Sequence, residues 1–433
     1  TVDEEGRFTK EAPGFEGLEI IQLEGKNIGK DGPANKAVID ALIQANALLA
    51  RGQLKHSYPH SWRSHAPLIF RNTPQWFIAL DKPYDAAGGK SLRQVALSEI
   101  ERVDWGQRRL NDDRDQNRIK AMIAERPDWL ISRQRSWGVP LPILVSKADG
   151  SILQDDEVDA RILAAMKQGG ADVWWSTPAQ DFLGAKYKAE DYEKVEDILD
   201  VWFDSGSTHA FVMGDRDAPT RASFKNPASV LYLEGSDQHR GWFHSSLLES
   251  CATRGRAPYD EVITYGFTVA EDGRKMSKSL GNGVEPQQIE KEYGIEPFRL
   301  LIASADYRDE LRLGKTILAQ ATEMYRKLRN TLRYTLGALK DFSEEEGFLP
   351  PFTGEVVERS ETDGGGAAPS VALSRAGSHV NGGAKELPLL ERWLLHRLWQ
   401  LDAIVREAYA TYQFRAALSA IVEFCNVDLS AFY

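Results

Sequence analysis

The segment Leu231-Tyr232-Leu233-Glu234-Gly235-Ser236-Asp237-Gln238-His239-Arg240-Gly241-Trp242-Phe243 decides the fold of the centre of this 433-residue chain. Short apolar runs at 141–145, 230–233 and 262–264 are bounded by polar or Gly-containing turns, and a helical pattern follows over 242–253. Strands alternating with helices in this way are typical of an α/β fold with a parallel sheet. Residues 234–241 then lie where a strand ends and a helix begins, the edge at which open α/β sheets bind anionic ligands.

A second polar segment, Lys275-Met276-Ser277-Lys278-Ser279, places two ammonium groups and two hydroxyls on one short stretch, called the lysine loop below. Gly273 and Gly281 bracket it, which favours tight turns and a loop that opens and closes. A lysine cluster is often only a solvated surface. Together with the strand-to-helix edge, however, the loop favours binding of a polyphosphate.

Five further motifs share their wording and order with one family. They are Arg126-Pro127-Asp128-Trp129, Ile131-Ser132-Arg133-Gln134-Arg135, Trp137-Gly138-Val139-Pro140, Asp200-Val201-Trp202-Phe203-Asp204-Ser205-Gly206 and His56-Ser57-Tyr58-Pro59. With the central segment and the lysine loop, they make the chain similar to class I aminoacyl-tRNA synthetases and, within that class, to isoleucyl-tRNA synthetases. The valyl enzymes share the serine-arginine-glutamine stretch and the lysine loop, and they are the nearest alternative.

The resemblance implies an ATP-dependent activation of isoleucine to isoleucyl-adenylate, with Mg²⁺ accompanying ATP, and transfer to tRNA(Ile). The complete enzyme would also edit misactivated valine. Lys275 and Lys278 would stabilise charge on the phosphates without a covalent protein intermediate. The ATP and adenylate site implied by the family comprises Glu234, Gly235, Asp237, Gln238, His239, Lys275, Met276, Ser277, Lys278 and Ser279. By resemblance, Glu234, Gly235 and Asp237 face the ribose and Gln238 faces the amino-acid carboxylate.

Two tryptophans, Trp202 and Trp242, would form walls of the isoleucine side-chain pocket by the same resemblance. Each has a structural alternative, since tryptophans are more often core residues. The polar residues 234–239 likewise read as an ordinary polar loop on composition alone.

The C-terminal third is predicted to be helical, with amphipathic patterns over 315–340 and 390–408 that are typical of a packed bundle. The first pattern has a basic outer face, and the family assigns tRNA binding to this region. Candidate contacts are Arg326, Lys327, Arg329 and Arg333, with a solvated helix face as the alternative. Between the helices, residues 355–383 contain glycine clusters and no aromatic residue, so we expect this insert to be disordered.

The family resemblance divides the chain into four domains. Residues 1–53 would be the C-terminal remnant of a β-rich editing domain, and 54–125 a connection to the catalytic core, to which no chemistry is assigned. Residues 126–297 would be the second half of a Rossmann-like catalytic domain, and 298–433 a truncated anticodon-binding helical domain. The His-x-Gly-His motif of the family is missing, so an internal fragment, inactive by itself, is expected. A catalytically incomplete tRNA-binding piece is the alternative of another class.

Composition sets outer limits on function. The net charge is −11, so tRNA binding would depend on local basic surfaces. Cys251 and Cys425 lack the paired spacing of a zinc site and are expected to be reduced core thiols. Gly314-Lys315-Thr316 lacks the upstream glycine of a P-loop. No apolar run is long enough to span a bilayer, and a cytoplasmic monomer is expected.

Overall fold

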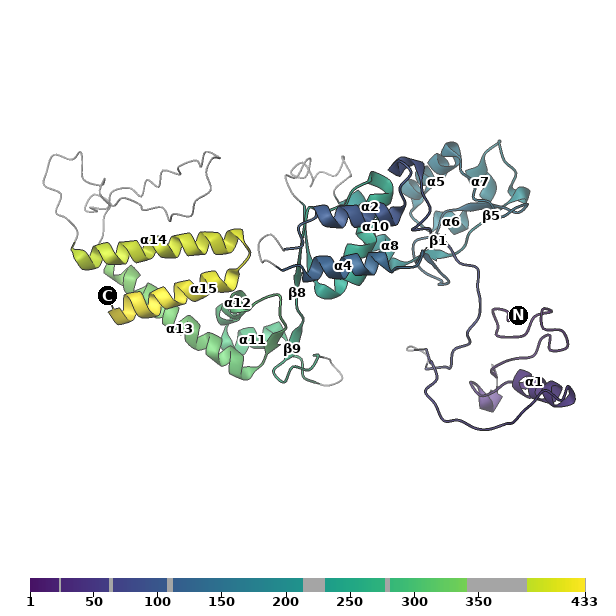
Figure 1. The fold of residues 1–433 in the computed structure, drawn as a ribbon, viewed down its shortest axis with the longest axis horizontal. Coiled ribbons are helices and arrows are strands. Elements are labelled where there is room, and N and C mark those ends of the chain that lie inside the picture. The colour runs from purple at the N-terminus through teal and green to yellow at the C-terminus, as the bar shows by residue number, and fades with distance from the viewer. Residues whose placement is uncertain are drawn as a thin grey trace. The chain divides into compact units, whose positions relative to one another are not determined.

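The computed structural model describes residues 1–22, 25–61, 65–106, 112–212, 230–276, 281–340 and 388–432, which form two units (Figure 1). The first unit contains Thr1–Ile78 and Leu130–Ser132. Its elements are η1 (Gly25–Asn27), α1 (Pro33–Gln44) and β1 (Phe77–Ile78). Single antiparallel bridges, such as Val2 with Phe8 and Ile21 with Asp31, join its other segments.

The second unit, Ala79–Trp129 and Arg133–Tyr433, is built around a parallel strand pair. Strand β7 (Leu231–Gly235) pairs in register with β8 (Glu261–Tyr265). Three helices belong to the same part of the unit: α2 (Leu92–Arg102) packs on α4 (Arg114–Ala124) and on α10 (Trp242–Arg254). The predicted strands at 230–233 and 262–264 and the predicted helix at 242–253 are therefore confirmed, each within a few residues.

Local sequence explains where these helices begin. Ser91 accepts a hydrogen bond from the backbone N–H of Gln94, and the Gln94 side chain accepts one from the Ser91 N–H, which makes a capping box at the start of α2. Helix α10 is buried over Phe243–Cys251 because it packs against α2 on one side and against α8 (Val201–Gly206) on another. It is the central helix of this part of the unit.

A small α/β lobe precedes β7 in the chain. Strand β4 (Leu144–Ser146) pairs antiparallel with β5 (Tyr192–Lys194), and α5 (Asp156–Gly169) shares a buried cluster with β4. Its core contains Leu144, Val158, Ile162, Trp174, Phe182 and Leu183. The run at 141–145 was predicted as a strand of the parallel sheet. Its assignment to the parallel sheet is wrong, because a local apolar pattern does not determine which strand it pairs with.

The other described elements before β9 in the chain are short. They are η2 (Asp85–Ala87), β2 (Trp129–Leu130), β3 (Ser132–Arg133), α6 (Val173–Ser176), α7 (Ala179–Leu183), η3 (Ala189–Asp191), β6 (Ile198–Leu199), α9 (Thr208–Phe211) and η5 (Ser236–Arg240).

A second parallel pair leads into the helical part. Strand β9 (Thr268–Ala270) pairs with β10 (Leu311–Leu313), and α11 (Pro286–Tyr293) and α12 (Ile295–Ser304) lie between them in sequence. Ile289, Leu301, Leu313, Leu318 and Ala321 form one buried cluster. This cluster joins the strand pair to the first long helix.

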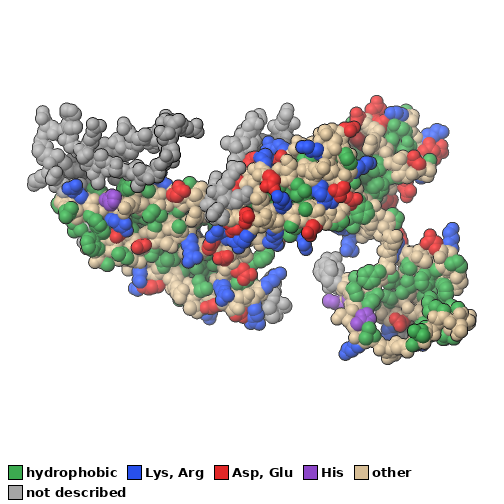
Figure 2. Space-filling view, viewed as in Figure 1, with side chains coloured by type: hydrophobic (Ala, Val, Ile, Leu, Met, Phe, Trp, Pro, Cys, Tyr) green, Lys and Arg blue, Asp and Glu red, His purple; other side chains and the backbone are tan. Residues whose placement is uncertain are grey.

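The helical part contains α13 (Lys315–Ala338), α14 (Leu389–Ala410), α15 (Phe414–Glu423) and the π-helix η7 (Phe424–Phe432). Helix α14 packs on α15, and α13 packs on α12 and η7, so both predicted amphipathic patterns are confirmed as helices. Leu336, near the end of α13, and Leu389, at the start of α14, are both exposed, and Figure 2 shows apolar side chains on the surface of the helical part. The insert at 355–383 lies outside the described residues.

Candidate functional site

The polar residues of the central segment lie at the carboxyl end of β7, as predicted. Strand β7 ends at Gly235, η5 carries residues 236–240, and α10 begins at Trp242. We call residues 234–242 the signature segment. Its backbone passes from strand to helix within eight residues, which places its side chains at the edge where parallel sheets bind ligands.

Glu234 is held by the neighbouring strand. The Tyr265 hydroxyl on β8 donates a hydrogen bond to Glu234 Oε1, which also accepts the Gly235 N–H at 3.0 Å. The Tyr265 hydroxyl, followed by that N–H, lowers the pKa of Glu234. Glu234 is thus an ionised, oriented hydrogen-bond acceptor at the strand end, which suits recognition of hydroxyl donors.

Gly235 and Gly241 are required by close approaches. A Cβ on Gly235 would lie 2.7 Å from Asp237 Oδ1. A Cβ on Gly241 would lie 2.6 Å from Gln238 Oε1 and 2.8 Å from the Trp202 ring. Because both positions are glycines, the side chains of Asp237, Gln238 and Trp202 can lie close to the backbone of the signature segment.

Gln238 caps helix α10. Its Oε1 accepts the Trp242 N–H at 2.9 Å, and its Nε2 lies 3.5 Å from Asp237 Oδ2. The side chain predicted to bind an amino-acid carboxylate therefore also satisfies one of the free donors at the helix start. Its amide group remains directed toward an acidic neighbour, at the long end of hydrogen-bond distance.

The two tryptophans predicted as pocket walls lie around Gly241. Trp202 on α8 contacts the position where a Gly241 Cβ would be, and 43% of it is exposed. Trp242 is half-buried and stacks on Tyr232 with ring centroids 4.1 Å apart and an interplanar angle of 11°. Trp202 is therefore not a core residue, whereas Trp242 has one face packed into the core.

His239 lies behind the signature segment. Its side chain is fully buried, and its ring stacks against Trp105 at 6.1 Å and meets Phe243 edge-on at 5.7 Å. Its Nδ1 lies 2.7 Å from the Ser236 carbonyl oxygen. Burial lowers the pKa of His239. The ring supports the segment from within.

The lysine loop begins next to β9. Gly273 adopts a left-handed φ of 81°, and Lys275 bridges back to Val269, so the chain reverses before the loop. The Lys275 side chain is exposed, whereas Met276 packs on the cluster around Ile289. Ser277, Lys278 and Ser279 lie outside the described residues. The described part of the loop is therefore anchored by Met276 and presents Lys275 to solvent.

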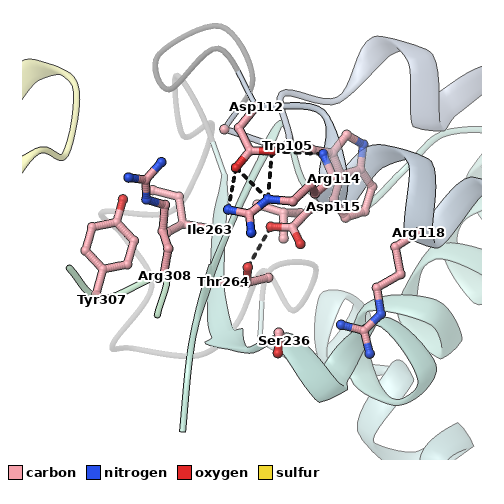
Figure 3. Close-up of a pocket in the computed structure, with 12 residues that line it drawn as sticks. Trp105, Asp112, Arg114, Asp115, Arg118, Ser236, Ile263, Thr264, Tyr307 and Arg308 are labelled. Carbon is pink, nitrogen blue, oxygen red and sulfur yellow. Dashed lines mark hydrogen bonds and ion pairs between the residues drawn. The ribbon is translucent and has the colours of Figure 1, made fainter. Parts of the chain in front are cut away.

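A pocket of about 330 Å³ adjoins the signature segment at Ser236 (Figure 3). Asp115 and Arg118 on α4, Thr264 on β8, and Tyr307 and Arg308 before β10 line it, with Trp105, Gly106, Asp112, Arg114, Val262 and Ile263. Arg114 pairs with Asp112 at 2.6 Å. No chemistry was expected from residues 54–125, so this charged wall was not predicted. The charged run at 112–118 marks this wall in the sequence, but the same run is typical of the solvated start of a helix.

The basic residues of α13 are exposed. Arg326 forms an ion pair with Glu323 at 2.8 Å, and Lys327, Arg329 and Arg333 are also on the surface. Arg329 and Arg333 border a groove of about 670 Å³ between α12 and α13. These four side chains are therefore accessible to a polyanion.

Within the described ranges, no group of three or more His, Cys, Asp or Glu residues could hold a metal ion. Cys251 and Cys425 are buried and unpaired, and burial raises the pKa of both thiols. None of the described helices is both long and apolar enough to cross a membrane.

Comparisons with known proteins identify the family of this chain. The family profile "tRNA synthetases class I (I, L, M and V)" matches residues 10–314, and the profile "Anticodon-binding domain of tRNA ligase" matches 391–433. Isoleucine–tRNA ligase of Caulobacter vibrioides is 52% identical over the whole chain, and that of Mesorhizobium japonicum is 48% identical. The chain spans 40% and 39% of these two relatives.

A solved structure shows a related fold. Mycobacterium tuberculosis methionyl-tRNA synthetase in complex with methionyl-adenylate superposes with a TM-score of 0.50 at 15% identity, covering 86% of this chain and 55% of that one. The predicted α/β class I fold is therefore confirmed. The profile covers well over half of the chain, so this chain belongs to the class I tRNA synthetases of the isoleucine, leucine, methionine and valine group.

Proposed function

We propose that this chain is part of an isoleucine–tRNA ligase, which activates isoleucine with ATP and transfers it to tRNA(Ile). The observation that carries the proposal is the signature segment, placed at a parallel strand end with Glu234 held and Trp202 exposed. Relatives named isoleucine–tRNA ligase, 52% and 48% identical across the full chain, support the choice of amino acid.

In the proposed reaction, the isoleucine carboxylate attacks the α-phosphorus of MgATP, and pyrophosphate leaves as the new acyl-phosphate bond forms. Glu234 and Asp237 accept hydrogen bonds from ribose hydroxyls, beside the close backbone approach at Gly235. The Gln238 amide orients the amino-acid carboxylate, and Trp202 and Trp242 border its side chain. The described chain thus supplies positioning groups, which lower the barrier by orienting the reactants.

Lys275, and Lys278 with Ser277 and Ser279 beyond the described residues, would bind the phosphates as charge moves onto the leaving pyrophosphate. The accessible Lys275 ammonium supports this role, since its main chain is anchored while its side chain is free in solvent. Met276 would contribute to the same site from the packed side of the loop.

The expected domain roles are part of the proposal. Residues 1–53 and 54–125 would belong to the editing domain's end and its connection, 126–297 to catalysis, and 298–433 to tRNA binding through Arg326, Lys327, Arg329 and Arg333. The match of an anticodon-binding profile to 391–433 supports the last role. The complete protein would edit misactivated valine, act as a cytoplasmic monomer and bind tRNA(Ile).

Pyrophosphate exchange tests the proposal on this chain and on the complete protein that contains it. We expect isoleucine-dependent exchange from the complete protein and none from residues 1–433. Preference for valine would favour a valyl-tRNA synthetase. Absence of exchange from both, with salt-sensitive tRNA binding retained, would favour a tRNA-binding protein without activation chemistry.

A further inference from the structure

Asp115, at the start of α4, contacts two elements that hold the signature segment. Its Oδ2 accepts the Thr264 hydroxyl of β8 at 2.6 Å (Figure 3), and its Oδ1 lies 3.4 Å from His239 Nε2. The acid side chain is 28% exposed, whereas the histidine side chain is fully buried. One carboxylate therefore bridges a helix, a strand and the signature segment.

The hydrogen on the His239 ring can be assigned from its other contact. Nδ1 lies 2.7 Å from the Ser236 carbonyl oxygen, which can only accept, so Nδ1 carries the hydrogen. In the neutral ring, Nε2 is then an acceptor. It is buried and makes no hydrogen bond with any described residue. A lone pair of His239 thus faces the Asp115 carboxylate.

Two hydrogen-bond acceptors at this distance repel each other unless a proton lies between them. The charged groups that face His239 are Asp115 and Arg118 on α4 and Asp237 on its own segment, while Trp105 and Phe243 cover the ring faces. Burial, with Arg118, disfavours the imidazolium, and the two acids favour it. The contact is therefore strained when the ring is neutral and becomes an ion pair when it is protonated.

We propose that Asp115 is a positioning residue of the signature segment, and that its contact with His239 becomes a hydrogen-bonded ion pair when the His239 ring is protonated. The inference rests on the proposed function only for its effect on ATP. Because His239 is four residues from the amide of Gly235 and one from Gln238, tightening this contact fixes the segment that would bind the adenylate.

Asp115→Asn is the informative variant, since the amide matches both partners without a proton. Its oxygen can accept the Thr264 hydroxyl, and its NH₂ can donate to His239 Nε2. Asp115→Ala removes both contacts. Asp113→Asn, an exposed neighbour in the same segment, is the matched control.

The first test is NMR of the chain with ¹³C,¹⁵N-labelled histidine, with His239 assigned by His239→Gln. We expect a neutral ring with hydrogen on Nδ1 at neutral pH in the wild type. In Asp115→Asn, the Nε2 resonance should show a new hydrogen bond and His239 should protonate only at lower pH. Asp113→Asn should match the wild type. Hydrogen on Nε2 in the wild type, or an Asp115→Asn spectrum equal to the wild type, would overturn the proposal.

The second test is kinetic and uses the complete protein. Asp115→Ala should raise the KM for ATP in isoleucine-dependent exchange roughly fivefold, the usual effect of one lost hydrogen bond, with a smaller change in kcat. In the wild type the KM for ATP should fall as His239 becomes protonated at lower pH. In Asp115→Asn the KM should be at or below the wild-type value at neutral pH and should not change with pH. Equal loss in both variants would show a merely structural carboxylate. If the wild type lacked exchange, the proposed function would fail while the NMR result still decided the role of Asp115.

Discussion

Replacing Glu249 by glutamine should stabilise the packing of α8 against α10, and most strongly at alkaline pH. Glu249 lies on α10, is 7% exposed, and its Oε1 is buried with no hydrogen-bond partner among the described residues. A Cβ on Gly206 would lie 2.1 Å from that oxygen, so the carboxyl group presses against α8. Burial, followed by the nearby Asp204, raises the pKa of Glu249 from 4.5 to about 8.

The sign of the change in unfolding free energy with pH follows from proton binding to Glu249. Below pH 4.5 both folded and unfolded states hold the proton, so the shift changes nothing. Between pH 4.5 and about 8 the unfolded state releases it while the folded state keeps it, so the free energy of unfolding falls as pH rises. Three to four pH units at 1.36 kcal/mol each set a limit of about 5 kcal/mol. The neutral amide should recover about half of this, after allowing for its own desolvation.

Denaturant unfolding followed by tryptophan fluorescence at about pH 5 and pH 8 measures the effect, with Glu290→Gln, an exposed substitution on α11, as control. Hydrogen exchange of α8 and α10 should localise the gain. The reasoning is refuted if wild type and Glu249→Gln lose stability equally between the two pH values. Since α8 carries Trp202, the same titration would loosen one proposed wall of the isoleucine pocket.

Three shorter predictions address the proposed site and the fold. Trp202→Ala in the complete protein should reduce kcat/KM for isoleucine more than for valine, by a differential of about 1 kcal/mol, while Trp242→Ala should also lower the melting temperature because it unstacks the core. Lys275→Ala should slow adenylate formation in rapid quench by roughly two orders of magnitude with isoleucine affinity unchanged, whereas Lys291→Ala should have no effect. Ser91→Ala should cost about 1 kcal/mol of unfolding free energy, and Ser91→Thr should recover most of it.

The strand-to-helix edge could be predicted from sequence because its signals are local. Apolar residues end at Leu233, a polar stretch follows, and a helical pattern starts at Trp242, so periodicity alone located β7 and α10. The strand predicted at 141–145 overlaps β4 (Leu144–Ser146), but its antiparallel partner was not predicted, since pairing depends on residues nearly fifty positions away. Local pattern thus identified elements better than it identified their neighbours.

The pocket wall on α4 could not be predicted for a different reason. Asp115 and Arg118 resemble ordinary solvated charges at the start of a helix, and only the packing of α4 against η5 brings them to Ser236 and His239. His239 carries no sequence mark of burial either, because it stands in a run of polar residues. The contact between α4 and the signature segment therefore depends on the tertiary structure.

The signature segment also shows why family motifs mix binding and structural roles. Gln238 caps α10, Gly241 admits the Trp202 ring, and His239 is fully buried, so each residue shapes the backbone that presents its neighbours. A substitution at Gln238 would therefore disturb the start of α10 together with any ligand contact. Separating the two effects needs a structural readout beside the kinetic one, since loss of activity alone is expected from either cause.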